Sequence, residues 1–165
     1  MLKVLRPARP GRGTVALLIA VVLGAGLAAA GWYEHDRAHR RDVAVRQSLA
    51  AADAAAQAIF SYDYRSFDAS VANGRAFATG DFAAEYAQTT AALKSNAVSE
   101  QAIVRASVSA SGVVSAAPDR VELLLYVDQY RRNTNITGEK VDQNRVVLTM
   151  VPVGGAWKVS HAVAV

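Results

Sequence analysis

The chain has 165 residues, which suits one ordinary domain, and 52% of them are hydrophobic while 19% are charged. This balance excludes a disordered chain, and the lack of cysteine excludes disulfides, thiolate nucleophiles and zinc–cysteine sites. The net charge of +4 comes from four basic residues before a long apolar run, and the remaining basic residues are balanced by the 14 acidic ones. The rest of the chain is therefore neutral, and we expect no nucleic-acid partner.

The apolar run from Thr14 to Tyr33 contains no charged residue. As a helix with a rise of about 1.5 Å per residue, it would span about 30 Å, the thickness of the hydrocarbon core of a membrane. Trp32 and Tyr33 suit the far interface, and the basic residues before the run indicate a cytoplasmic N-terminus. We expect a basic cytoplasmic stub (1–13), a transmembrane helix (14–33) and an extracytoplasmic domain (34–165).

A cleaved signal peptide is the alternative, because residues 28–30 are three alanines, a small-residue pattern of the kind found at cleavage sites. The apolar run is longer than such peptides need, and a helical pattern continues directly beyond it. Both features favour an uncleaved anchor at the cytoplasmic membrane.

Three helices are predicted next, and then four strands. The first helix covers 36–60, the second begins at Ser66 or Asp68 and ends near Gly74, and the third runs from Thr79 to about Lys94. From Gln101 the apolar residues alternate, which is the pattern of strands. Strands are expected from about 101 to 111, 121 to 130, 145 to 153 and 157 to 165, with a polar loop over 131–143 and a hairpin at 154–155.

This order of elements predicts an α+β fold, with three helices packed on a curved four-stranded antiparallel sheet. The long first helix would lie across the concave side of the sheet, an arrangement that suggests the nuclear transport factor 2-like cone. On the second strand, the aliphatic residues at 121, 123, 125 and 127 share one face, while the tyrosines and the aspartate at 126, 128 and 130 take the other. In the last strand, Trp157, Val159, His161, Val163 and Val165 should share one side.

Two clusters could serve a pocket or a partner. Tyr62, Asp63 and Tyr64 could carry out proton transfer on a bound lipid if Asp63 lay in a pocket, but packed rings and a capping carboxylate are the favoured interpretation. Asp128, with Tyr126 and Tyr130 beside it, could line a cavity, face a partner or belong to an ordinary solvated sheet face; these interpretations stay open.

No catalytic, cofactor-binding or metal-binding residue is predicted. His35 and His39 have a helical spacing that can bind a metal, but no third ligand is fixed by spacing, so a polar collar at the membrane surface is favoured. His161 is expected to be half-buried and structural rather than catalytic.

Six segments in a fixed order resemble the Mce-associated membrane proteins of actinobacteria. They are IFSYDYR (59–65), TGDF (79–82), AAPDRV (116–121), YVDQ (126–129), RVVLTMV (145–151) and GAWKVS (155–160). The resemblance covers nearly the whole chain. It implies a nuclear transport factor 2-like domain outside the membrane and an accessory role beside Mce-type lipid importers of the envelope. A similar design, with an anchor and the same cone, occurs in scaffold subunits of type IV secretion systems.

Three functions are compatible with these patterns. The first is a non-enzymatic subunit that assembles or stabilises an Mce-type import complex, with transporter subunits as partners. The second is a lipid- or sterol-binding module that uses the cone cavity. The third is a small isomerase-like enzyme that needs Asp63 or Asp128 buried in that cavity. A cone closed by alanine favours the first, an open cone the second, and an open cone with a buried acid the third.

Overall fold

The computed structural model describes residues 12–165, with side chains from residue 31 onward. The chain divides into two compact units, residues 1–39 and 40–165. The predicted stub (1–13) and most of the predicted transmembrane segment (14–33) thus lie outside the residues whose side chains are described. Within the described part of the chain, no helix combines the length and the apolar character that a membrane crossing requires. The anchor therefore stays a prediction.

Three α-helices are present in the described chain: α1 (Arg12–Phe60), α2 (Phe67–Phe77) and α3 (Gly80–Ser99). A single 3-10 turn, η1 (Tyr64–Ser66), leads into α2. The predicted start of the third helix is confirmed, with Thr79 as its N-cap, although its side chain makes no capping hydrogen bond.

The prediction that α2 stops at Gly74 is wrong, because the helix continues to Phe77. Gly74 is needed for packing and not for a left-handed helix end. A Cβ at this position would lie 2.8 Å from Tyr86 Cζ and 2.9 Å from the Ala58 carbonyl oxygen. The absent side chain lets α2 approach both α3 and α1.

The sheet of the described residues has five antiparallel strands, not the predicted four, in the order of the chain. They are β1 (Tyr62–Asp63), β2 (Ile103–Ala117), β3 (Arg120–Arg132), β4 (Lys140–Val153) and β5 (Ala156–Ala164). The added strand, β1, has two residues, too few to show any alternation. The predicted loop over 131–143 is also shorter, because β3 and β4 extend into it.

The predicted face of the last strand is wrong beyond Val159. Thr149 is opposite His161, but Met150 is opposite Val159, so Ser160 is an extra residue on β5. Such a bulge moves all following side chains to the other face. His161 is consequently exposed rather than half-buried, and Ala162 takes the core side instead.

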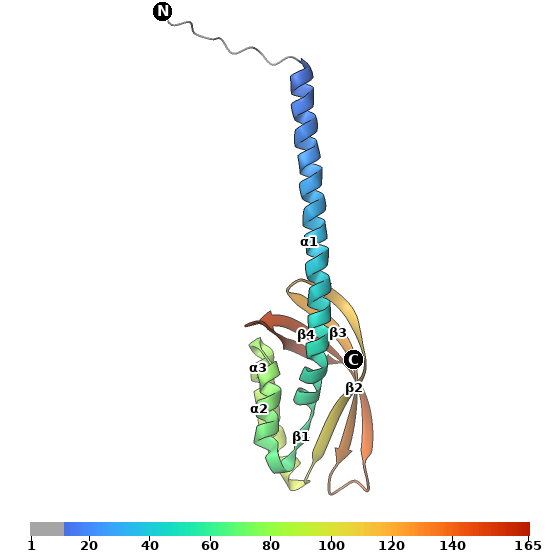
Figure 1. The fold of residues 1–165 in the computed structure, drawn as a ribbon. Coiled ribbons are helices and arrows are strands. Elements are labelled where there is room, and N and C mark those ends of the chain that lie inside the picture. The colour runs from blue at the N-terminus through green and yellow to red at the C-terminus, as the bar shows by residue number, and fades with distance from the viewer. Residues whose placement is uncertain (1–11) are drawn as a thin grey trace, which may run out of the picture. The chain divides into compact units, whose positions relative to one another are not determined.

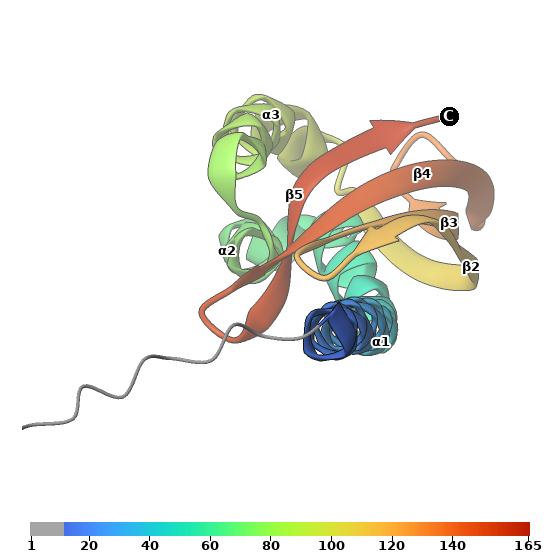
Figure 2. The same cartoon turned by 90° about the horizontal axis from the view of Figure 1, so that it is seen from above.

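The core of the second unit forms between α1 and the concave side of the sheet, and α2 and α3 lie beside β5 (Figures 1 and 2). The α1 side chains here are mainly alanine, and Ala52, Ala55 and Ala56 are fully buried. On the sheet, the aliphatic face predicted for β3 is confirmed, since Leu123 and Leu125 have no exposed surface. Small residues on the helix and large ones on the strands therefore belong to one buried core.

Candidate functional site

The motif that contains Tyr62, Asp63 and Tyr64 forms where the chain leaves α1 and joins the sheet. Tyr62 pairs with Val104 and Asp63 with Ile103, which places β1 at the start of β2. Ser61 stabilises this junction, because its Oγ accepts a hydrogen bond of 2.9 Å from the backbone N–H of Ala106. The two-residue strand thus sends successive side chains to opposite faces of the sheet.

Tyr62 belongs to a small apolar cluster on the core side. Its ring packs edge-on against Phe67 with centroids 5.5 Å apart, next to the buried residues Ala97 and Ala102. Burial raises the pKa of the Tyr62 hydroxyl, while the positive charge of Arg131 opposes that rise. The phenol stays protonated at neutral pH and has a packing role here.

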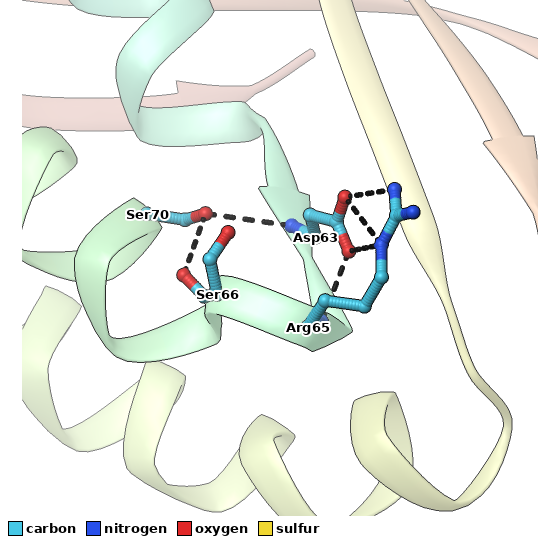
Figure 3. Close-up of polar contacts among 4 residues, drawn as sticks. All are labelled: Asp63, Arg65, Ser66 and Ser70. Atoms are coloured by element: carbon cyan, nitrogen blue, oxygen red, sulfur yellow. Dashed lines mark hydrogen bonds and ion pairs between the residues drawn. The ribbon is translucent and has the colours of Figure 1, made fainter.

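Asp63 is held by its own turn (Figure 3). Its Oδ1 accepts hydrogen bonds from the backbone N–H of Arg65 at 2.9 Å and from Arg65 Nε at 3.0 Å, and its Oδ2 lies 2.6 Å from Arg65 Nη2. The Asp63 N–H donates to Ser70 Oγ at 3.4 Å, and Ser70 Oγ donates to the Ser66 carbonyl at 3.2 Å. The hydrogen bonds from the Arg65 side chain, and then the one from its backbone N–H, lower the pKa of Asp63. The carboxylate is an ionised cap with 28% of its side chain exposed.

Tyr64 is half-buried and continues the same turn. Its backbone N–H donates to the Ala102 carbonyl at 3.0 Å, and its ring centroid lies 5.8 Å from the guanidinium carbon of Arg65. The three motif residues therefore build a junction between α1, α2 and β2.

The second cluster lies on the outer face of the sheet, opposite the core. Tyr126 is 44% exposed, Asp128 accepts a hydrogen bond of 3.2 Å from Gln143 Nε2, and Tyr130 is half-buried. Their position on this face, away from the aliphatic residues of β3, agrees with the predicted alternation. None of the three lines any of the cavities described below.

The structure brings Asp63 to this same outer face, which the sequence did not indicate. Asp63 is opposite Ile103, and the alternation on β2 puts Ile103 and Arg105 on one side. Arg105 in turn is opposite Tyr130, and its positive charge contributes to the lowered pKa of Asp63. Tyr62 faces the core. Of the two β1 residues, only Asp63 therefore shares the outer face with Tyr126, Asp128 and Tyr130.

An apolar cavity of about 380 Å³ lies among the end of α1, α2, α3 and the sheet, which it reaches at Gln129 and Ala162. Its lining includes Ile59, Phe60, Tyr62, Phe67, Val71, Phe82, Tyr86 and Leu93, with Glu85 and Gln129 as polar members. The sequence spaces Phe82, Tyr86 and Leu93 by four and seven residues, which corresponds to one helix face. It gave no sign of Phe67 and Val71, because α2 is too short for a clear stripe.

A more open depression of about 610 Å³ lies beside the motif, lined by residues of α1, α2 and β2 together with Ser61, Tyr62 and Asp63. Asp63 is at its border and already ion-paired. Among the described residues, no group of three or more histidine, aspartate or glutamate side chains is placed to hold a metal ion, and this includes His35 and His39.

No family model matches the chain. The uncharacterized protein Rv1362c of Mycobacterium tuberculosis is 26% identical over 152 residues, which cover 88% of this chain and 68% of that protein. This is a distant likeness to a protein whose name assigns no function.

The fold is similar to that of solved proteins of type IV secretion systems. An IcmL-like protein of Legionella pneumophila aligns with a TM-score of 0.61 and 15% identity, over 75% of this chain and 90% of that one. CagV of Helicobacter pylori, a VirB8 homologue, gives 0.55 and 12%, over 70% and 93%. The periplasmic domain of DotI gives 0.54 and 15%, over 71% and 91%.

A putative aromatic ring hydroxylase from Novosphingobium aromaticivorans also shares the fold, with a TM-score of 0.51 and 10% identity, over 74% of this chain and 85% of that one. At such identities the likeness concerns the fold alone. The same scaffold carries different functions, so the function must be argued from the residues of this chain.

Proposed function

We propose that this chain is a non-enzymatic accessory subunit of a cell-envelope transport complex, of the Mce type that imports lipids. Residues 14–33 would anchor it in the cytoplasmic membrane, with the N-terminus in the cytoplasm and the domain outside. The fold shared with secretion-system proteins and the mycobacterial relative support an accessory role in the envelope. The six segments of the sequence resemblance support the Mce assignment.

The observation that carries the proposal is the filled interface between α1 and the sheet. Ala52, Ala55 and Ala56 of α1 and Leu123 and Leu125 of β3 are fully buried in one core cluster, so the helix and the sheet are packed together at this level. The two candidate acids lie elsewhere, Asp63 in an exposed ion pair and Asp128 on the outer face. A general base would need one of them in a dry pocket beside a substrate.

The test is affinity purification of the full-length chain, tagged after Val165, from its own membranes in mild detergent. The control carries the same tag and residues 1–39 fused to an unrelated domain, which keeps the predicted anchor and removes the second unit. The proposal predicts that Mce-type transporter subunits are enriched with the full chain and not with the control. Recovery of no transport subunit above the control level would overturn it.

A lipid- or sterol-binding module is the second candidate, favoured by the apolar cavity of about 380 Å³ beside α3. Thr89 is exposed at the border of this cavity, so Thr89→Trp should fill it without disturbing the core. Native mass spectrometry of the full chain measures bound lipid directly. A stoichiometric lipid that Thr89→Trp removes would support the second candidate over the first.

A further inference from the structure

The apolar cavity of about 380 Å³ has a buried interior and one exposed border. Of the residues that line it, only Glu85 and Thr89 are exposed, and both lie on α3, about one helical turn apart. The interior is formed by aliphatic and aromatic side chains, among them Ile59, Phe67 and Phe82, each at most 9% exposed. The mouth of the cavity therefore lies beside Glu85 and Thr89, and an apolar part of a ligand suits the space behind them.

Two polar side chains of the lining are already engaged by the chain itself. Gln129 Nε2 donates a hydrogen bond of 3.3 Å to the Phe60 carbonyl, and Gln129 Oε1 accepts one of 2.9 Å from Asn144 Nδ2. Thr90 Oγ1 donates to the Tyr86 carbonyl at 2.7 Å. An alkyl chain can lie against these groups and leave their hydrogen bonds in place.

The volume of the cavity limits the size of the ligand. A cavity of about 150 Å³ with aliphatic and aromatic walls holds benzene, so about 380 Å³ corresponds to about 15 carbon-sized atoms. One alkyl chain of about a dozen carbons fits this volume on the same scale. A sterol has nearly twice as many carbons, and a lipid with two such chains also exceeds the volume, so neither fits inside.

The charges around the cavity select the head group. Glu85 belongs to no ion pair among the described residues, and no lysine or arginine of residues 12–165 lines the cavity. Arg131, whose charge acts on Tyr62 in the lining, already pairs with Asp142 at 2.8 Å. A carboxylate or phosphate head at the mouth would thus meet a like charge with no free cation to offset it. Hydroxyl groups suit the mouth, because they donate to the Glu85 carboxylate and can donate to or accept from Thr89 Oγ1.

We propose that this cavity binds a single-chain amphiphile with an uncharged, hydroxyl-bearing head, of which a monoacylglycerol is the simplest example. The alkyl chain lies in the apolar interior, and the head lies at the mouth beside Glu85 and Thr89. The inference rests on the second candidate function, the binding module, and names its ligand class. The accessory role is tested separately by the purification of transport subunits.

Photolabelling of the full-length chain in phospholipid nanodiscs tests the site. The probe is monododecanoylglycerol with a diazirine near the end of its alkyl chain, and mass spectrometry locates the label. We expect the label on interior residues of the cavity such as Phe67 and Phe82. Thr89→Trp, which fills the cavity at its border, should reduce this label at least about tenfold, which corresponds to about 1.4 kcal/mol of binding free energy. Gln88→Trp is the matched control, because Gln88 is exposed on α3 and does not line the cavity. It should leave the label unchanged.

Competition tests the ligand class. Unlabelled monododecanoylglycerol should remove the label, whereas the same concentration of cholesterol should not. Dodecanoate should also leave the label in place at about pH 9, where the fatty acid is ionised. Glu85→Lys should turn dodecanoate into an effective competitor, because the mouth then carries a positive charge. Glu85 is exposed and belongs to no ion pair, so the fold tolerates this change.

The possible failures can be told apart. If the cavity residues of the wild-type chain carry no label, both the inference and the second candidate function are overturned. If dodecanoate or cholesterol removes the label as well as monododecanoylglycerol does, the ligand class is overturned and the binding module stands. If dodecanoate stays ineffective with Glu85→Lys, Glu85 does not select the head group and the inference is overturned at that point.

Discussion

Gly74 shows at the scale of one residue how a helix position can be fixed by its neighbours. It lies inside α2, where the ring of Tyr86 and the Ala58 carbonyl come too close for a side chain. We predict that Gly74→Ala lowers the free energy of unfolding by about 1–3 kcal/mol, as overpacking does in cores, despite the higher helix propensity of alanine. Urea unfolding of the full chain in detergent, followed by tryptophan fluorescence, measures the change.

Tyr86→Phe provides the control for this prediction, because the contact involves the phenol hydroxyl and its ring carbon. In the Gly74→Ala chain it should restore part of the loss, with a coupling energy of at least about 0.5 kcal/mol. Strictly additive effects would show that the crowding between α2 and α3 is not the cause.

The lowered pKa of Asp63 predicts how the stability of the fold changes with pH. Its pKa is lowered in the folded chain by Arg65, so the folded state favours the carboxylate. The resulting stability is present above the unfolded pKa of about 4 and is lost as pH falls through the lower folded value. Asp63→Asn should flatten the dependence of unfolding free energy on pH below about pH 4.

The effect of Asp63→Asn at neutral pH should stay under about 1 kcal/mol, because the ion pair is exposed to solvent. Asp53→Asn, at an exposed position on α1, is the matched control. If Asp63→Asn leaves the dependence of unfolding free energy on pH below about pH 4 unchanged, the role assigned to the Asp63–Arg65 ion pair is contradicted.

Residue roles could be predicted from the sequence only in part. The favoured interpretation of the motif matches the structure at Asp63, which caps η1, and at Tyr62, which packs on Phe67. The place of Asp63 on the outer face could not be predicted, because it depends on the two residues of β1 pairing with β2. Pairing between distant segments leaves no local periodic signal.

At the scale of elements, the alanines of α1 set how closely the helix lies on the sheet. Ala56 is fully buried, whereas Ala54 on the same helix is exposed. We predict that Ala56→Leu lowers the free energy of unfolding by about 1–3 kcal/mol, because the added atoms have no space. Ala54→Leu should change it by less than about 0.5 kcal/mol. Equal effects of the two changes in urea unfolding would contradict the packed interface.

Strands with regular alternation were predictable, and departures from regularity were not. The core face of β3 follows directly from its alternating aliphatic residues. The fifth strand and the bulge at Ser160 leave no such pattern, so the strand count and the face of His161 were wrong. A single inserted residue reverses every later side chain, and sequence alternation alone cannot reveal it.

At the scale of the whole molecule, the proposal requires the chain to stay tethered. We predict that the mature chain remains in the membrane fraction at its full mass of 17.4 kDa, and that a reporter fused after Val165 is active only outside the cytoplasm. Mass spectrometry of the membrane and soluble fractions checks the first point. A soluble chain that begins near Gly31 would support the cleaved signal peptide instead.

The most direct test of a non-enzymatic accessory role is the membrane level of Mce-type transporter subunits in cells that lack this chain. Quantitative immunoblotting would compare the deletion strain with strains that carry the wild-type chain or the Asp63→Asn/Asp128→Asn variant. The account predicts that the deletion lowers the subunit level and that both chains restore it equally. An unchanged level in the deletion strain, or a folded double variant that fails to restore it, would contradict the account.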